Sequence, residues 1–225
     1  MDTNDRLLAA RDESLIATNK VLRNTYLLLG LTLLFSGMAA AFSVATDAGY
    51  PGIILTLVGV YGLMFLTQAL RNSIWGLVSA FAFTGFMGYI LGPLLNFYIA
   101  NFSNGGELIA TAFGATGVVF FALSGYVLTT RKDFSYLSGF IFIAIVCAIL
   151  MTIVGLFTQI PALSLGISAL FVLISSAMIL FQTSIIIQGG ERNYIMATIS
   201  LYVAIYNLFV SLLQLFAAFG GNNRN

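Results

Sequence analysis

The sequence contains no histidine, a single cysteine and very few charged residues. Of its 225 residues, 9 are Lys or Arg and 8 are Asp or Glu, which is 8% of the chain, whereas soluble domains carry about 25% charged residues. Without histidine, and with Cys147 inside an apolar run, an ordinary zinc site, a His-based triad or an internal disulfide is excluded. The net charge of +1 argues against nucleic acid as a partner, because binding it requires a basic face. We therefore expect a protein that is not an enzyme and that holds no metal or cofactor.

The few charges that are present leave long gaps between them. Stretches without a single charged residue run over 24–46, 48–70, 72–106, 108–130, 134–190 and 193–223. A soluble protein built this way would have nothing with which to cover its surface. The runs are apolar at odd and even positions alike, which argues against the alternating strands of a β-barrel. The chain is therefore expected to be an all-α integral membrane protein that lies in a lipid bilayer.

The number of spans follows from the lengths of these stretches, because a helix crosses the hydrocarbon core in about 20 residues. The polar segment 96–106 is expected to be a loop, so the stretch 72–106 holds one span. The stretch 134–190 is too long for one crossing, and we expect Gln159-Ile160-Pro161 to divide it because proline disrupts a helix. The result is seven predicted spans, at 25–45, 53–70, 74–95, 107–129, 135–158, 162–187 and 194–219.

Basic residues gather on one side of this predicted bundle. The N-terminal side carries Arg6, Arg11, Lys20, Arg23, Arg71, Arg131, Lys132 and Arg192, and the other side has only Arg224. Because basic loops stay in the cytoplasm, we expect the N-terminus to be cytoplasmic and the C-terminus to be external. The chain then divides into a charged cytoplasmic tail at 1–22, a transmembrane domain at 23–219 and a short external tail at 220–225.

The region before the first span admits more than one interpretation. Lys20 and Arg23, followed by an apolar run and Ala39-Ala40-Ala41, imitate a signal peptide with its cleavage site. Four acidic residues in a long leading segment favour a retained span instead. The tail itself is weakly amphipathic, and it is either a solvated, partly disordered terminus or a contact site for a cytoplasmic partner.

Glycines are frequent in the middle spans, where small residues let transmembrane helices approach closely. They occur at Gly59 and Gly62 in the second span, at Gly85, Gly88 and Gly92 in the third, and at Gly114 and Gly117 in the fourth. We interpret them as packing positions, which indicate a tight bundle and do not indicate transport.

The last two spans each carry one polar stripe. At 100° per residue, Ser200, Ala204, Asn207, Ser211 and Gln214 fall on one face of the last span, and Ser164, Ser168, Ser175 and Gln182 fall on one face of the span before it. Unpaired amides in contact with acyl chains are costly, so both stripes should face protein or a wet cavity. The stripes indicate either a hydrogen-bonded interior or a polar path for a weakly bound cation. Such a path would lack the carboxylates that calcium prefers.

Several segments distributed over nearly the whole chain form a specific set. They are KVLRNTY at 20–26, YGLMFLT at 61–67, SAFAFTGF at 79–86, GYILGP at 88–93, YVLTTRKD at 126–133, FQTS at 181–184, GGERNY at 189–194 and LYVAIYNLF at 201–209. Together they resemble the YccA branch of the Bax inhibitor-1 (TMBIM) superfamily of bacterial inner-membrane proteins. The resemblance implies seven helices, with the last one enclosed by the other six.

Two functions attach to this superfamily. The resemblance implies a modulator and slow substrate of FtsH, the ATP- and zinc-dependent AAA+ protease of the inner membrane, with degradation beginning at the cytoplasmic tail. Other branches act as pH-sensitive calcium leaks governed by one aspartate in span 6 and one in span 7. Those aspartates correspond here to Gln182 and Ala204, which cannot ionise, so the resemblance favours the modulator over the leak.

The candidate gate or pore positions are therefore polar or small residues of the last two spans. They are Gln182, Ala204, Ser200, Asn207, Ser211, Gln214 and Ser175. The amide of Gln182 can still hydrogen-bond to Ser200 or Asn207, and such a bond would keep the pore closed.

Overall fold

The computed structural model describes residues 3–158 and 160–222, and it describes their side chains except for those of residues 3–17 and 156. Within these residues the chain forms seven α-helices and no strand. The helices are α1 (Thr3–Ala45), α2 (Ile53–Leu70), α3 (Ile74–Asn101), α4 (Gly105–Thr130), α5 (Leu137–Thr158), α6 (Pro161–Ile187) and α7 (Tyr194–Gly220). Each contains a segment long and apolar enough to cross a membrane. The prediction of a seven-helix membrane protein is confirmed.

The helix boundaries agree with the predicted spans to within a few residues, except in α1 and α3. Residues 96–101, predicted to be a loop, continue α3 as helix. The Asn96 side chain donates from Nδ2 to Asp47 Oδ1 (3.1 Å), and Asn101 donates back to the carbonyl of Phe97 (2.8 Å). These bonds satisfy the amides while the backbone stays helical, so the polar composition does not end the helix.

At the other predicted break, Pro161 is the first residue of α6, where a missing N–H costs nothing. Gln159 lies outside the described residues.

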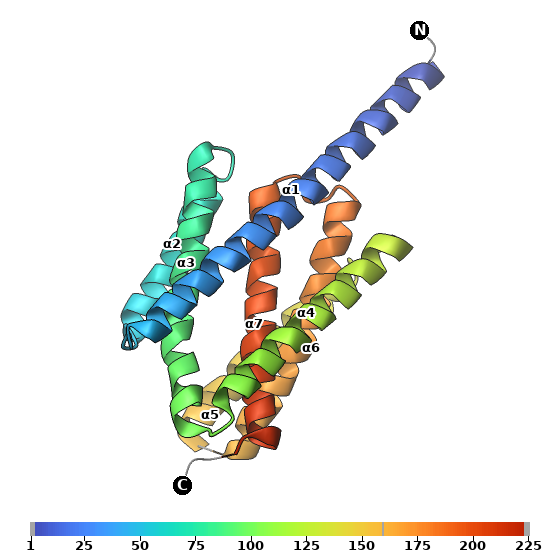
Figure 1. The fold of residues 1–225 in the computed structure, drawn as a ribbon. Coiled ribbons are helices and arrows are strands. Elements are labelled where there is room, and N and C mark those ends of the chain that lie inside the picture. Colours follow the sequence, from blue (N-terminus) through green and yellow to red (C-terminus); the bar gives the residue numbers. More distant parts are fainter. Residues whose placement is uncertain (1–2, 159, 223–225) are drawn as a thin grey trace.

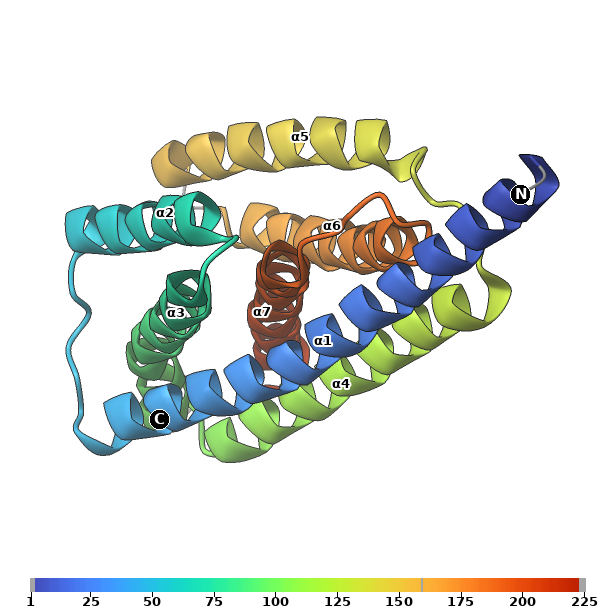
Figure 2. The same ribbon diagram turned by 90° about the horizontal axis from the view of Figure 1, so that it is seen from above.

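The last helix lies at the centre of the bundle, as Figure 2 shows. It contacts α1, α2, α3, α4 and α6, and 61% of its span is buried inside the protein, against 6% for α2 and 17% for α5. Over the described residues α5 packs only against α6, so α7 is enclosed by five helices. The sixth helix, α5, lies outside these five.

The first helix extends well beyond the membrane-embedded bundle. It begins at Thr3, whereas its apolar part covers Thr18–Ala45, and Figure 1 shows its N-terminal end projecting away from the other helices. At 1.5 Å per residue, its 43 residues span roughly 64 Å. The charged tail is therefore helical and continuous with the first span over the described residues.

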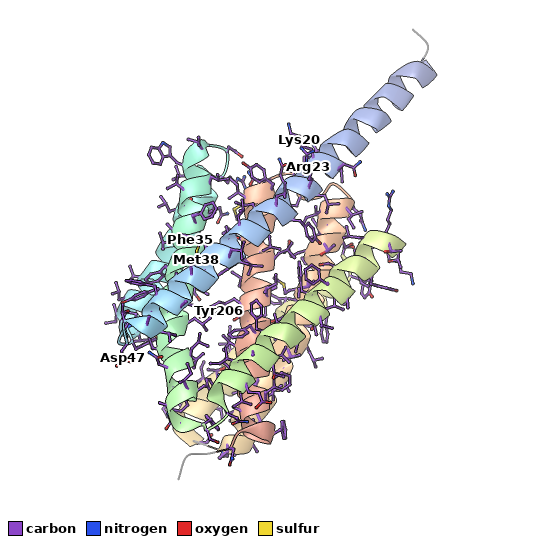
Figure 3. All side chains as sticks on the ribbon, in the orientation of Figure 1. Lys20, Arg23, Phe35, Met38, Asp47 and Tyr206 are labelled. Carbon is purple, nitrogen blue, oxygen red and sulfur yellow. The ribbon has the colours of Figure 1, made fainter. Side chains whose placement is uncertain are left out.

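The connections that carry the basic residues lie at one end of the bundle. The α2–α3, α4–α5 and α6–α7 connections are at the end from which the N-terminal helix projects, and the C-terminus is at the opposite end (Figure 1). Figure 3 shows Lys20 and Arg23 near the first end and Asp47 near the second. The described side chains thus reproduce the predicted charge asymmetry, and Arg224 lies outside the described residues.

Glycines bring α1 and α3 into close contact. A Cβ atom built on Gly88 would lie 2.1 Å from the carbonyl oxygen of Ser36, and one on Gly92 would lie 2.1 Å from Ser43 Oγ. A Cβ on Gly85 of α3 would meet the ring of Phe35 of α1 at 2.6 Å. In the neighbouring α2–α3 pair, a Cβ on Gly59 would overlap the ring of Phe86. The packing interpretation is confirmed at these positions. By contrast, Gly62, Gly114 and Gly117 face open space.

We expect Gly88→Ala to destabilise the bundle, because its methyl group would overlap the α1 backbone. Overpacking of this kind costs about 1–3 kcal/mol, which a thermal or denaturant unfolding series in detergent would measure. Gly62→Ala is the matched control, since its methyl group meets nothing within 4 Å and should leave stability unchanged or raise it slightly. Equal losses in the two variants would contradict the proposed steric cause.

Candidate functional site

The predicted gate positions all lie away from the most exposed surface of the bundle. Ser175, Ala204 and Ser211 are buried, with exposed fractions of 2%, 2% and 5%, and Gln182, Ser200, Asn207 and Gln214 are half-buried. The helices that carry them, α6 and α7, pack directly against each other. The polar stripes therefore lie within or beside this contact, and the amides do not project fully into lipid.

The two stripes meet through one hydrogen bond near the end of the bundle that carries the C-terminus. Ser168 Oγ of α6 lies 2.6 Å from Gln214 Oε1 of α7 and 3.0 Å from the carbonyl oxygen of Ser164 in its own helix. Both acceptors compete for the single hydroxyl proton. The shorter distance favours the bond to Gln214, which joins the two helices.

The hydrogen bond expected for Gln182 does not form. Among the described residues no hydrogen bond joins its amide to Ser200 or Asn207, and the polar contacts are made by the next residue in the helix. Thr183 Oγ1 lies 3.4 Å from Tyr26 Oη of α1 and 3.4 Å from Ser124 Oγ of α4. One residue turns the helix by about 100°, so the face that links α6 to α1 and α4 is not the face predicted from the stripe.

The most deeply buried polar contact centres on Tyr202, which lies on a face of α7 away from the predicted polar stripe. Tyr202 is 1% exposed, its hydroxyl lies 2.6 Å from Ser36 Oγ of α1, and it donates to the carbonyl of Thr84 in α3 at 3.2 Å. A carbonyl can only accept, so the phenolic proton points to Thr84 and the Ser36 hydroxyl donates to Tyr202. The ring of Phe83 packs edge-on against Tyr202 with centroids 6.1 Å apart. One side chain of α7 thus joins three helices.

A second network fixes the end of the bundle that carries the basic loops. The Asn193 side chain caps α7 by accepting from the N–H groups of Ile195 (3.0 Å) and Met196 (3.1 Å). Its Nδ2 donates to the carbonyl of Arg71 at 2.8 Å and to Asn72 Oδ1 at 3.1 Å. The α2–α3 turn is thereby tied to the first turn of the central helix.

The neighbouring α4–α5 loop is held in a similar way. Ser184 of α6 accepts from the N–H of Phe134 (2.9 Å) and donates to the carbonyl of Lys132 (3.2 Å). Beside them, the N–H of Ser135 donates to Asp133 Oδ1 at 2.8 Å, and this hydrogen bond lowers the pKa of the Asp133 carboxyl. The loop is therefore ordered by hydrogen bonds to the end of α6.

Among the side chains that the structure describes, the polar groups buried in this interior are hydroxyls, and half-buried amides lie beside them. Among the described residues no group of three or more His, Cys, Asp or Glu side chains could hold a metal ion. Hydroxyls and amides can orient helices and hold water, but they do not ionise near neutral pH. The arrangement supports a structural or binding role.

Comparisons with known proteins agree with this fold. The family described as inhibitor of apoptosis-promoting Bax1 (Bax1-I) matches residues 18–221. The chain is 62% identical over 203 residues to an uncharacterized protein of Pseudomonas aeruginosa, covering 90% of this chain and 91% of that protein. It is 55% identical over 213 residues, covering 94% and 96%, to the Escherichia coli K12 protein named Modulator of FtsH protease YccA. A membrane protein of Vibrio cholerae is 42% identical over 212 residues, covering 94% and 95%.

We expect Tyr202→Phe to lower the stability of the bundle by about 1–2 kcal/mol, because Ser36 and the Thr84 carbonyl would lose a buried partner. Unfolding of the purified protein in detergent would measure the loss. Tyr206→Phe is the matched control on the same helix, since no hydrogen bond of its hydroxyl is found among the described residues. A loss as large in Tyr206→Phe would show that the hydrogen bonds of Tyr202 are not the cause.

Proposed function

The chain belongs to the Bax inhibitor-1 family, and we propose that it acts in a bacterial inner membrane as a modulator of an FtsH-type ATP-dependent protease. The observation that carries the proposal is its 55% identity, over 94% of its length, to a protein named as a modulator of that protease. Identity of this extent covers every helix of the bundle, so the whole fold is shared.

The chemistry of the interior supports a role exerted by contact. A regulator of a protease needs a stable surface and an accessible segment, and it does not need a reactive group. The buried hydroxyl of Tyr202 and the cap at Asn193 stabilise one arrangement of the helices. We infer that the chain acts through the surfaces of this bundle and has no catalytic activity of its own.

The placement of charge supports one orientation in the membrane. The basic loops lie at the end from which α1 projects (Figure 1), and basic loops are retained in the cytoplasm. We therefore infer a cytoplasmic N-terminus and a periplasmic C-terminus. In this orientation the tail at 1–22 lies on the side where ATP is available to an AAA+ protease.

The tail is the segment that we propose as the point of engagement. Its residues 1–22 carry seven of the 17 charges of the chain, and the helix that begins at Thr3 projects past the other helices of the bundle (Figure 1). An ATP-dependent protease must take hold of an accessible terminus before it can extract a helix from the membrane. We infer that degradation of this chain begins at the tail and then slows at the packed α1–α3 pair.

Deletion of residues 2–18 should lengthen the half-life of the protein in cells that contain the protease. The basic residues Lys20 and Arg23 remain, so the orientation of the first span should be preserved. A pulse-chase measurement with and without the protease would test the prediction. Replacement of the same residues by a Gly/Ser segment of equal length is the control that separates tail length from tail sequence.

Modulation is tested separately from degradation. The full-length protein should co-purify with the protease from native membranes after cross-linking, and it should slow the degradation of another membrane substrate in reconstituted vesicles. An unchanged half-life on deletion, with co-purification retained, would remove the tail from the mechanism. Failure to co-purify or to slow the second substrate would contradict the modulator function itself.

A cation leak of low conductance is the second candidate, and the observation that favours it is the burial of the polar stripes. Ser168 and Gln214 meet at 2.6 Å, and Ser175 lies buried between Ser168 and Gln182 on the same face of α6. Polar groups lined up in this way can hold water or weakly bound ions. Intramembrane relays, however, normally depend on ionisable side chains, and none of these positions can ionise.

We expect calcium flux in reconstituted vesicles to equal that of empty vesicles at acidic and at alkaline pH. A Gln182→Asp, Ala204→Asp double variant should conduct if the scaffold has lost only its carboxylates, because two buried acids would attract a cation. The double variant Gln182→Asn, Ala204→Ser is the uncharged control and should show no calcium flux above that of empty vesicles. Flux through the unmodified protein at either pH would establish the leak and would contradict our expectation.

A further inference from the structure

The second helix is attached to the bundle along only part of its surface. Over the described residues α2 packs against α3 and touches α7, with no packing against α5 or α6, and Figure 2 shows it at the edge of the bundle. At the end of α2 that carries the basic loops there is a hollow of about 510 Å³, lined by Phe65, Gln68, Ala69, Arg71 and Asn72. All five lining residues are exposed, so the hollow is open to the surroundings of the helix.

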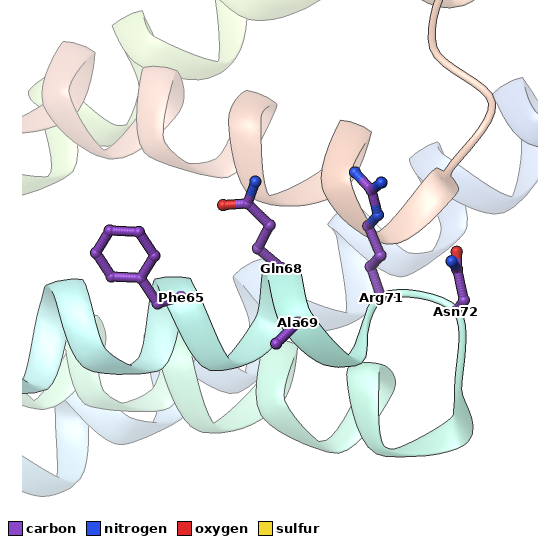
Figure 4. A pocket seen from close by; sticks show the side chains of 5 residues that line it. All are labelled: Phe65, Gln68, Ala69, Arg71 and Asn72. Atoms are coloured by element: carbon purple, nitrogen blue, oxygen red, sulfur yellow. The ribbon is translucent and has the colours of Figure 1, made fainter.

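The lining of this hollow combines an apolar part with a polar, positively charged part. Figure 4 shows Phe65, Gln68, Arg71 and Asn72 projecting from the same side of α2 and of the turn that follows it. The lining has one positive charge, from Arg71, two amides and no carboxylate. Its chemistry therefore suits a ligand that has an anionic group at one end and an apolar group at the other.

The depth of these residues in the membrane matches a lipid molecule. The 18 residues of α2 span roughly 27 Å, close to the ~30 Å of the hydrocarbon core. Arg71 follows the last residue of α2 directly, so its guanidinium lies at headgroup level. Phe65, six residues earlier in the helix, lies roughly 9 Å deeper and is 63% exposed. The exposed Trp75 at the start of α3 marks the same interface, where tryptophan is enriched.

The position of Arg71 is fixed by the central helix. The Asn193 side chain donates to the carbonyl of Arg71 and to Asn72 Oδ1 while it caps α7. The guanidinium therefore extends from a turn that is tied to the most buried helix of the protein. A mobile loop would have to become ordered before it could bind a ligand. This turn is already held in place by the hydrogen bonds from Asn193.

We propose that this hollow binds one anionic phospholipid of the cytoplasmic leaflet. The lipid phosphate accepts hydrogen bonds from the Arg71 guanidinium and from the amides of Gln68 and Asn72, and an acyl chain lies along Phe65. A zwitterionic lipid would bring an amine to a site that has no carboxylate to receive it. A basic residue close to the cytoplasmic surface of the membrane attracts anionic headgroups, and Arg71 supplies that charge here.

The experiment uses the only tryptophan of the chain, Trp75, as the probe. The full-length protein is reconstituted into phosphatidylcholine vesicles that contain either brominated phosphatidylglycerol or brominated phosphatidylcholine at equal mole fraction, and quenching of Trp75 is compared. We expect the anionic lipid to be enriched near Trp75 by roughly five-fold, as one basic residue near the surface contributes about this factor. Equal quenching by the two lipids would overturn the proposal whatever the variants do.

Variants then assign the preference to one side chain. Arg71→Gln should abolish the enrichment, and Arg71→Lys, which keeps the charge but loses the planar fork, should retain part of it. Arg131→Gln is the control, since it removes an exposed basic residue at the same end of the bundle, directly after α4. An equal loss in Arg131→Gln would show attraction by surface charge in general and would overturn the site.

A final comparison separates a lipid from a free anion. The quenching comparison is repeated in two samples of equal ionic strength, one with added inorganic phosphate and one with added chloride. The preference for phosphatidylglycerol should be the same in both. Loss of the preference in phosphate alone would identify a free phosphate as the occupant and overturn the lipid proposal.

Discussion

Lipid hydrocarbon offers no hydrogen-bond partner, so each polar group within a membrane span must find one inside the protein. In this bundle the requirement is met most tightly at Tyr202, whose hydroxyl joins Ser36 of α1 to the backbone of α3 at Thr84. Gly88 and Gly92 let α3 approach the backbone of α1 at Ser36 and Ser43, beside this contact. The same group of residues thus joins α7 to the closely packed α1–α3 pair.

Much of the architecture could be predicted from the placement of a few charges. Charge-free stretches located the spans because a charge is costly in hydrocarbon, and a helical period located the faces of α6 and α7. Periodicity gives the direction of a side chain but not its partner, so it places Tyr202 on a face of α7 away from the polar stripe without identifying Ser36 and Thr84 as its partners. The same limit explains Gln182, whose neighbour Thr183 makes the interhelical contacts. The helical continuation over 96–101 depended on a tertiary bond from Asn96 to Asp47, which no local pattern reveals.

The interior and the periphery of the molecule suit different tasks. The interior is joined by hydroxyl and amide contacts between helices, such as those of Tyr202 and of Gln214, which favour one arrangement of the helices. The periphery is less tightly joined, because α2 and α5 contact few other helices and present long apolar faces. These two helices have the least buried spans of the bundle, so much of their surface is available to lipid or to a protein partner in the membrane. A contact function and a lipid site at Arg71 are therefore compatible with the same rigid centre.

The continuity of α1 from Thr3 to Ala45 has a mechanical consequence. A flexible linker absorbs tension by uncoiling, but a continuous helix passes an axial pull along its hydrogen-bonded backbone to the point where it is anchored. In this protein the anchor is the close contact of α1 with Gly88 and Gly92 and the Ser36 bond to Tyr202. A load applied at the N-terminus is therefore carried first by the tightest contacts of the bundle. Separation of α1 from the bundle would be abrupt, because it would break the contacts of α1 with both α3 and α7 at once.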